Sequence, residues 1–378
     1  MTRNPQSRAF KEPKVWIVAP TSPPYGGMSV QAERLKSRLV GEGIDAQIIP
    51  TNPPPPWRLK VLEQVPVLRT ILREIQYLLS LARIFRTPGV VHHLSASHLY
   101  FFLHSAPLLL GRWSSAKIVL NYRGGRANEF LRSWSWAVLP LLRRADRIVV
   151  PSEFLQRAFR DYGLASSLLP NLADTELFPF IRREQFRPRL FVSRNLEPMY
   201  SVECVLRAFQ KVQAKFPQAV VGIAGEGSEA GRLRGLVEEW GLSGVHFYGA
   251  VPQETLPSLY EQYDIYVNAS RVDNFPGALV EAACAGLPIV TTRAGGIPEM
   301  IRHRENGLLC DLGDADALAN GVLDIVQHPE FGRQLAQAAR TWAEQFSWHK
   351  VFPQLMQAYG IETGDRFSAM EADQILVH

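Results

Sequence analysis

The stretch Asn268–Glu299 (NASRVDNFPGALVEAACAGLPIVTTRAGGIPE) constrains the fold of this chain most. A Pro-Gly turn, a helix of small residues, a short apolar strand and a Gly-Gly loop follow one another, the order of a unit in a parallel α/β sheet. A helix that begins near Gly277 presents unpaired backbone N–H groups, which bind phosphate. The carboxylates of Asp273 and Glu281 accept hydrogen bonds, for example from ribose hydroxyls. The stretch predicts a nucleoside-diphosphate cradle; the alternative is an ordinary loop, helix and strand with solvated charges.

The alternation of strands and helices runs through the chain twice. With 378 residues, the chain is long enough for two domains. We therefore predict two doubly wound α/β domains joined near Pro170–Pro188, with the ligand at the carboxyl ends of the strands. The predicted strands are 14–19, 44–50, 90–94, 117–121 and 147–150 in the first run, and 189–193, 219–224, 245–248 and 264–267 in the second.

The cysteines and the apolar segments indicate the compartment. Cys204, Cys284 and Cys310 are odd in number and form no CxxC pair, so they fit a reducing compartment rather than a disulfide framework or a zinc site. The polar N-terminus has no signal-peptide character. The longest apolar run, Leu99–Gly111, falls short of the ~20 residues that span a bilayer, and we expect a buried helix there. These features predict a cytoplasmic protein.

The two halves of the chain differ in charge. Residues 1–172 hold 23 Lys and Arg against 10 Asp and Glu, a net charge of +13, whereas residues 173–378 hold 18 against 26, a net charge of −8. A basic half favours an anionic acceptor or an anionic membrane surface. Nucleic acid would also match the charge, but no nucleic-acid-binding module is visible, and we expect no such partner.

Two interpretations stay open for the aromatic, arginine-flanked stretch Phe130–Leu142. It is either a core helix or a helix that rests on a membrane surface through Trp134 and Trp136. Aromatic side chains fill cores more often than they touch lipid, which favours the core.

Five motifs in register resemble one family. The segment DNFPGALVEAACAGLPIVTTRAGGIPEMI resembles the donor-binding motif of the retaining GT-B glycosyltransferases of family 4. The resemblance extends over roughly Lys14–Gly360, in the order of the family. The supporting motifs are Gly26-Gly27, PNLADTELF at 170–178, GEG at 225–227 and FSWHKVFPQLMQAYG at 346–360.

The resemblance implies an α/β fold of the GT-B type, with two Rossmann-like doubly wound domains facing across a cleft. An acceptor-side domain would cover residues 1–172 and a nucleotide-sugar-binding domain residues 173–345. A helix at 346–362 would cross back to the first domain. The polar tail at 363–378 lacks an apolar face, and we expect it to be mobile.

The resemblance also assigns roles to residues that match the family motifs. Glu281 would bind the donor ribose, and Asp273 stands where the first glutamate of the E-x7-E pair approaches the donor sugar. The further donor-binding positions are Gly277, Ala278 and Leu279, whose N–H groups would hold the diphosphate, together with Phe275, Gly225, Gly26 and Gly27. Glycines at 26 and 27 let backbone pass close to the phosphates and the acceptor.

The sequence departs from the family pattern in three places. Asp273 is one methylene shorter than the usual glutamate. Arg194 is present, but the lysine expected after it is replaced by Met199-Tyr200, which removes a fixed cation beside the leaving group. Arg123 stands where many members have a histidine. Its guanidinium is either a clamp that compensates for the missing lysine, a holder of an anionic acceptor, or a surface arginine.

Three other signals carry little weight. Asp314-Ala315-Asp316 looks like a metal-binding DxD, but an Asp before an apolar helical pattern is more often an N-cap. His92-His93 follow each other in a strand and point to opposite faces, so they are poor joint ligands. The Gly225-Glu226-Gly227 segment lacks the third glycine of a dinucleotide fingerprint.

The expected function is retaining transfer of a sugar from a nucleoside-diphosphate sugar to a carbohydrate or lipid-linked acceptor hydroxyl, in polysaccharide or glycolipid assembly. The family implies a front-face mechanism with no metal and no cofactor beyond the nucleotide sugar, and with a cytoplasmic location that includes the inner membrane face. The alternatives are a non-catalytic glycosyltransferase-like binding subunit and a GT-B-fold epimerase or phosphorylase. A phosphorylase would need a lysine for pyridoxal, and the second half offers only Lys211, Lys215 and Lys350.

Overall fold

The computed structural model of the protein describes residues 14–22, 26–54, 65–84, 87–111 and 115–361. The chain divides into two compact units. Unit 1 comprises the described parts of Met1–Val150, Ala158–Leu169 and His349–His378, and unit 2 comprises Pro151–Arg157 and Pro170–Trp348. The main boundary between the units therefore lies between residues 169 and 170, three residues before the predicted boundary. The tail predicted at 363–378 lies outside the described residues.

Unit 1 contains a six-stranded parallel sheet with the order β2-β1-β3-β4-β5-β6. The order changes direction between β1 and β3, because the chain leaves β1 for one neighbour and returns to the other side. The strands are β1 (Val15–Ala19), β2 (Ala46–Pro50), β3 (Val90–Ser95), β4 (Lys117–Tyr122), β5 (Arg147–Val150) and β6 (Ser167–Leu168).

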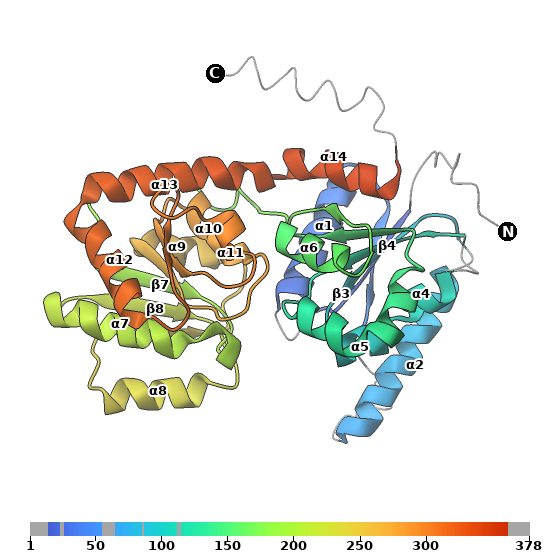
Figure 1. Ribbon diagram of the computed structural model, residues 1–378, viewed down its shortest axis with the longest axis horizontal. Coiled ribbons are helices and arrows are strands. Elements are labelled where there is room, and N and C mark those ends of the chain that lie inside the picture. The colour runs from blue at the N-terminus through green and yellow to red at the C-terminus, as the bar shows by residue number, and fades with distance from the viewer. Residues whose placement is uncertain (1–13, 23–25, 55–64, 85–86, 112–114, 362–378) are drawn as a thin grey trace, which may run out of the picture. The chain divides into compact units, whose positions relative to one another are not determined.

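Helices cover both faces of this sheet (Figure 1). The side chains of His92 and His93 point to opposite faces of the sheet, as the alternation of side chains along β3 predicts. The Tyr359 hydroxyl on the last helix lies 3.0 Å from His92 Nδ1, whereas His93 lies on the side of His104. The helices are α1 (Gly27–Gly41), α2 (Pro66–Ile84), α3 (Leu99–His104), α4 (Ala106–Leu110), α5 (Ala127–Leu142) and α14 (Trp348–Tyr359). A further helix, α6 (Glu153–Arg160), is divided between the two units at Arg157/Ala158.

Unit 2 contains a second six-stranded parallel sheet, with the order β12-β11-β10-β7-β8-β9. Here the direction changes between β7 and β10. Two hydrophobic cores pack on opposite faces, one under α7, α8 and α12 and the other under α9, α10 and α13. The sequence-predicted strands of both runs are confirmed to within two residues at their ends.

The elements of unit 2 follow the chain in this order: β7 (Arg189–Ser193), α7 (Val202–Lys215), β8 (Val220–Ala224), α8 (Ala230–Glu239), β9 (Val245–Gly249), α9 (Leu256–Gln262), β10 (Ile265–Asn268), α10 (Gly277–Cys284), β11 (Ile289–Thr292), α11 (Ile297–Met300), β12 (Leu308–Cys310), α12 (Ala315–Gln327) and α13 (Pro329–Ala343). Short 3-10 helices, η3 (Pro198–Tyr200) and η4 (Glu344–Phe346), precede α7 and α14.

The structure corrects two expectations about apolar helices. The core interpretation of Phe130–Leu142 is wrong for its tryptophans, because Trp134 is 43% exposed and Trp136 76% exposed on α5. The single buried helix expected at Leu99–Gly111 is divided into α3 and α4, and Leu99 is exposed. Among the described residues, no helix is both long and apolar enough to cross a bilayer.

Asp314 caps α12, as expected. Its Oδ1 accepts a hydrogen bond from the Ala317 N–H at 2.8 Å. Asp316 instead forms an ion pair with Lys211 on the surface. The two carboxylates of the DxD-like segment therefore have separate structural partners.

Candidate active site

The topological switch of unit 2 brings Arg194 and Asp273 together. Arg194 directly follows β7, and Asp273 lies in the loop after β10, the strand that pairs with β7 on its other side. Such switch points leave a crevice at the carboxyl ends of the strands, where α/β proteins bind ligands. The Arg194 guanidinium forms an ion pair with the Asp273 carboxylate, and both side chains are 12% exposed.

The Asp273 carboxylate is held by the backbone as well as by Arg194. The N–H groups of Asn274 and Phe275 donate hydrogen bonds to it. Burial raises the pKa of Asp273 above its usual value, and the opposing charge of Arg194 and the hydrogen bonds lower it. This arrangement holds the carboxylate in one orientation, and burial shifts its titration toward the protonated form.

Tyr200 holds the other side of Arg194. The guanidinium carbon lies 4.1 Å from the centroid of the Tyr200 ring, a cation–π contact. Tyr260 and Tyr266 also lie near this guanidinium. In the sequence, Met199-Tyr200 is notable only because it replaces the lysine of the family pattern. No sequence signal indicates that the tyrosine stacks on the remaining cation.

The glycines near the site allow backbones to approach closely. A Cβ at Gly295 would collide with the Asp273 carbonyl oxygen, and Gly295 has a φ of +50°. The next residue, Gly296, donates its N–H to the same oxygen at 3.0 Å. A Cβ at Gly225 would likewise collide with the Arg194 carbonyl oxygen, and its φ is +147°. Gly295-Gly296 and Gly225 therefore set the backbone positions of Asp273 and Arg194.

Glu281 is anchored on α10 by two side chains. The Tyr260 hydroxyl lies 3.3 Å from Glu281 Oε2, and Gln253 Nε2 lies 3.4 Å from Glu281 Oε1. The Tyr260 hydroxyl also lies 2.7 Å from the Ser193 hydroxyl at the end of β7. This chain of polar contacts fixes Glu281 relative to the strand that carries Arg194.

The N-terminus of α10 lies in the segment between Asp273 and Glu281. Pro276 stands at the N-cap and supplies no side-chain cap. The Leu279 N–H is already used by the Pro276 carbonyl at 3.1 Å. Three backbone N–H groups are predicted to bind the diphosphate. Of these, the N–H groups of Gly277 and Ala278 lie in the first turn, where the helix offers them no backbone acceptor. A Cβ at Gly277 would meet no atom within 4 Å among the described residues.

Phe275 contributes a packed ring and two backbone groups to the segment before α10. Its ring packs edge-on against Phe346, with the ring centroids 5.0 Å apart, and belongs to a hydrophobic core. Its carbonyl accepts a hydrogen bond from Asn171 Nδ2 at 3.0 Å. The contribution of Phe275 to the site is therefore its backbone N–H on Asp273.

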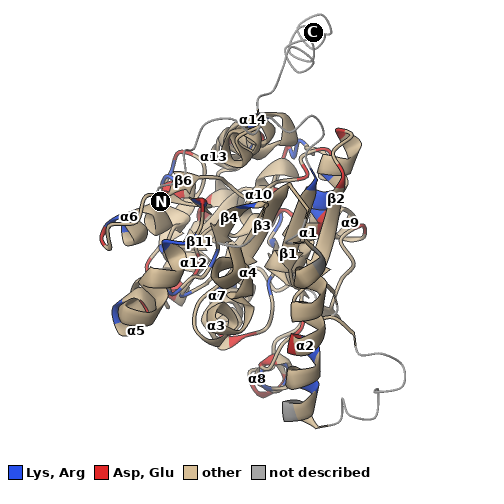
Figure 2. Cartoon of the chain, turned by 90° about the vertical axis from the view of Figure 1, so that its right-hand side faces the viewer, with Lys and Arg blue, Asp and Glu red and all other residues tan. Residues whose placement is uncertain are grey.

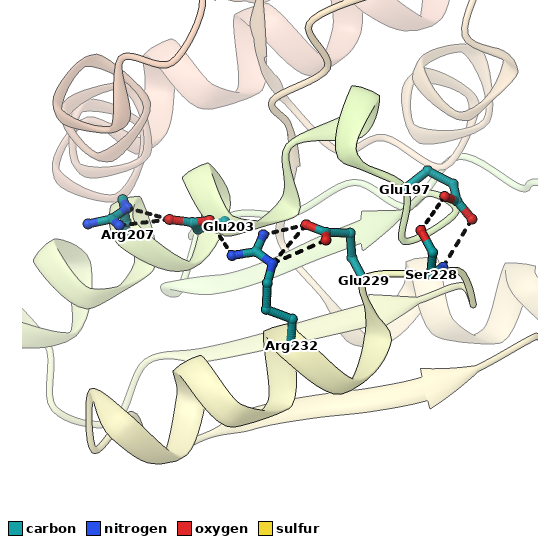
Figure 3. A network of polar contacts seen from close by, with 6 residues as sticks. All are labelled: Glu197, Glu203, Arg207, Ser228, Glu229 and Arg232. Carbon is teal, nitrogen blue, oxygen red and sulfur yellow. Dashed lines mark hydrogen bonds and ion pairs between the residues drawn. The ribbon is translucent and has the colours of Figure 1, made fainter.

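A polar network supports the two loops that follow β7 and β8 (Figure 3). The Ser228 hydroxyl and N–H both donate to the Glu197 carboxylate, at 2.6 and 3.1 Å. Nearby, Arg232 binds Glu229 and Glu203, and Glu203 also binds Arg207. These contacts tie the segment after Gly227 to the loop that carries Arg194.

The predicted residues of unit 1 lie at the carboxyl ends of its strands. Arg123 follows β4, and its N–H donates to the Ser95 carbonyl of β3 at 2.8 Å. Its side chain is half-buried, and burial lowers the pKa of Arg123 to about 10, so it stays charged at neutral pH. Gly26 caps α1 and Gly27 begins it, and a Cβ at either position would meet no atom of the described chain within 4 Å.

Within unit 2, the structure brings together the predicted Arg194, Asp273, Glu281 and Gly225 around the start of α10. Two models of protein families match the chain. The model of Glycosyltransferase Family 4 matches residues 25–177, and the model of Glycosyl transferases group 1 matches residues 174–342. The chain belongs to the group 1, family 4 glycosyltransferases.

Curated relatives of this family 4 chain are distant. A GDP-mannose-dependent alpha-(1-6)-phosphatidylinositol monomannoside mannosyltransferase of Mycolicibacterium smegmatis is 26% identical over 56% of the chain and 64% of the relative. The sulfoquinovosyl transferase SQD2 of Arabidopsis thaliana is 26% identical over 69% of the chain and 54% of the relative. The matched part of the chain thus spans less than two thirds of these relatives.

Solved structures show the same fold as this family 4 chain. A sucrose-phosphate synthase from Thermosynechococcus elongatus matches with a TM-score of 0.75 and 19% identity, over 92% of the chain and 98% of the relative. The Anabaena protein HepE, in complex with UDP and glucose, matches with a TM-score of 0.69 and 18% identity, over 92% of the chain and all of the relative. These neighbours identify the fold as GT-B.

Proposed function

We propose that the protein transfers a hexosyl group from a nucleoside-diphosphate sugar to a hydroxyl of a carbohydrate or lipid-linked acceptor, with retention. The observation that carries this proposal is the Arg194–Asp273 pair at the β7/β10 switch point, beside the uncapped start of α10. The bond that breaks joins the sugar to the phosphate leaving group. Arg194 can contact the phosphate while Asp273 contacts the sugar. Polysaccharide or glycolipid assembly is the process that fits this chemistry.

Each residue of the site has a part in the proposed reaction. Arg194 and the N–H groups of Gly277 and Ala278 bind the diphosphate and stabilise the charge that develops on it. Asp273 accepts hydrogen bonds from hydroxyls of the donor sugar, and Glu281 accepts those of the ribose. The sugar passes through an oxocarbenium-like state while the acceptor attacks from the face that the diphosphate leaves.

In this front-face mechanism the proton of the acceptor hydroxyl goes to the departing diphosphate. The sugar forms no covalent bond to a protein nucleophile. We propose that neither a metal nor a cofactor takes part besides the nucleotide sugar. In unit 1, Arg123 binds an anionic group of the acceptor, because its guanidinium stays charged and can hold two oxygens at once.

A non-catalytic binding subunit is the second candidate, and a specific observation favours it. The lysine that would stand near Met199 is absent, and the remaining cation, Arg194, is already paired with Asp273. A site with less net positive charge stabilises a leaving diphosphate less well. Such a subunit would bind nucleotide without turnover.

A panel of UDP-, GDP- and ADP-sugars, each with and without acceptor extract, tests the proposal. We expect one donor to release its nucleoside diphosphate, faster with acceptor, and NMR of the product to show the donor's anomeric configuration. Binding without release of product would support the subunit. An epimerised sugar nucleotide would support the third alternative, the epimerase.

We also propose that the protein works in the cytoplasm as a peripheral protein at the inner face of the cell membrane. Its basic half and the exposed Trp134 and Trp136 support this location, since cations and interfacial tryptophans favour anionic membrane surfaces. The name of one relative, a phosphatidylinositol monomannoside mannosyltransferase, supports a lipid acceptor.

A further inference from the structure

Helix α2 has its apolar face turned to solvent. Five large apolar side chains on it are 41–63% exposed, and they recur at the spacing of one helical face. At 100° per residue they fall within a sector of about 100°. The five are Leu68, Ile71, Ile75, Leu78 and Leu79.

The opposite face fixes the orientation of α2 in unit 1. Tyr77, Leu81 and Ile84 are buried, and the Tyr77 hydroxyl donates to the His104 carbonyl at 3.2 Å. Glu74 also points inward, with its Oε1 3.4 Å from His104 Nε2. The helix therefore uses polar contacts on its inner side and leaves a broad apolar face outside, the reverse of the usual surface helix.

Exposed apolar side chains concentrate on the same unit. Among the described residues, twelve of the fifteen large hydrophobic side chains that are exposed lie in unit 1, so this unit has an uncovered apolar surface. Besides the five on α2, they include Leu99 on α3, Leu109 on α4, and Trp134 and Trp136 on α5. The five on α2 share one helical face, and contiguous exposed apolar surface of that kind marks an interaction site.

Charge distinguishes a lipid surface from a protein partner. The exposed Arg69 flanks the apolar face of α2, and residues 1–172 have a net charge of +13. In Figure 2, α2 is drawn mostly in the colour of uncharged residues, with few charged positions along it. A broad apolar face with basic flanks is typical of helices that lie in the interface of an anionic bilayer, whereas a coiled-coil seam is narrower.

We propose that the outer face of α2 is the membrane-docking surface of the protein, and that it inserts Leu68, Ile71, Ile75, Leu78 and Leu79 into the interfacial layer of an anionic bilayer. This inference deepens the proposed peripheral location and rests on it, but it uses no residue of the donor site. Docking would place α2 in the membrane plane, with its His104 and Glu74 contacts facing the protein.

Flotation of the full chain with vesicles tests the proposal. The vesicles contain either phosphatidylcholine alone or equal parts of phosphatidylcholine and phosphatidylglycerol. Wild type should float with the mixed vesicles at low salt and less at high salt. The double variant Ile75→Ser/Leu79→Ser should bind at least tenfold more weakly. Val40→Ser on α1, which removes another exposed apolar side chain of unit 1, should bind as wild type does.

Three outcomes would overturn the inference. The first is a wild type that stays unbound at low salt, and the second is a double variant that floats as well as wild type. The third is a wild-type dimer that the double variant converts to monomer, with no vesicle binding, since α2 would then contact a second copy. Donor turnover, measured in the same samples without vesicles, reports on the proposed function separately, because α2 carries no donor-site residue.

Discussion

Arg194 lies between the ring of Tyr200 and the carboxylate of Asp273, with its guanidinium carbon 4.1 Å from the ring centroid. The aromatic face and the carboxylate together hold the cation in one orientation, so it needs little rearrangement to meet a phosphate. Packing against Tyr200 thus fixes the orientation of the Arg194 guanidinium. This order partly compensates for the second cation, the lysine, that the family pattern has near this position.

Replacing Tyr200 tests this relationship. Tyr200→Leu removes the cation–π contact, worth about 0.5–2 kcal/mol, and should raise the donor KM about two- to thirtyfold. Tyr200→Phe keeps the ring and should stay within about twofold of wild type. Steady-state kinetics with the active donor measures both. Equal losses in the two variants would assign the effect to the hydroxyl rather than to stacking.

The pH dependence of the reaction should follow Asp273. Because burial raises the pKa of this carboxyl above 3.8, the acid limb of kcat/KM should have its midpoint above pH 3.8. The folded protein binds this proton more tightly than the unfolded chain, so the stability from Asp273 is full below pH 3.8 and is lost as pH rises through the folded pKa.

Asp273→Asn removes that titration. Its Tm, compared with that of wild type over the same pH series, should therefore fall less as pH rises from 3.8. The comparison uses the slope, because exchanging the carboxyl for an amide also changes the uncharged contacts of residue 273 and so shifts Tm at every pH. Parallel slopes would contradict a raised pKa of Asp273.

Gly295→Ala should damage the site through the backbone. A Cβ there collides with the Asp273 carbonyl oxygen at a φ of +50°, and we expect a loss of about 1–3 kcal/mol in stability with at least tenfold lower kcat/KM. Gly231→Ala on α8 is the control, since its Cβ meets no described atom within 4 Å, and it should be stable and active. Chemical denaturation and kinetics measure the two effects. A fully active Gly295→Ala variant would show that the loop does not set the position of Asp273.

Asp314→Ala should lower stability by about 1 kcal/mol, because Asp314 accepts the Ala317 N–H at the start of α12. Asp316→Ala loses only an exposed ion pair and should change stability by less than about 0.5 kcal/mol. Both variants should keep donor turnover. If both lost turnover together, the segment would have a role in the reaction beyond capping.

The strand–helix alternation was predictable because it depends on local patterns of apolar residues. Strands such as β7 and β10 are continuous apolar runs between turn residues, and Asp314 is recognisable as a cap from its neighbours alone. The two-residue β6 was missed, because a strand of that length leaves no periodic signal.

Side-chain partners across the sheet were not predictable in the same way. Tyr200 meets Arg194, and Tyr260 links Ser193 to Glu281, only after the chain has folded. The apolar spacing of α2 was visible in the sequence, but which face turns outward depends on the contacts of Tyr77 and Glu74 with His104. Tertiary contacts of this kind have no signature in one sequence.

The most direct test of the proposed donor site in unit 2 is nucleoside-diphosphate release by Glu281 variants, measured with the donor that wild type uses. Glu281→Ala and Glu281→Gln remove the carboxylate that Tyr260 and Gln253 position, whereas Glu330→Ala removes an exposed carboxylate on α13 that pairs with Arg333 on the surface. We predict that both Glu281 variants lose at least tenfold in kcat/KM while Glu330→Ala matches wild type and all remain folded. Unchanged donor hydrolysis and transfer in Glu281→Ala would contradict the assignment of the donor site to unit 2.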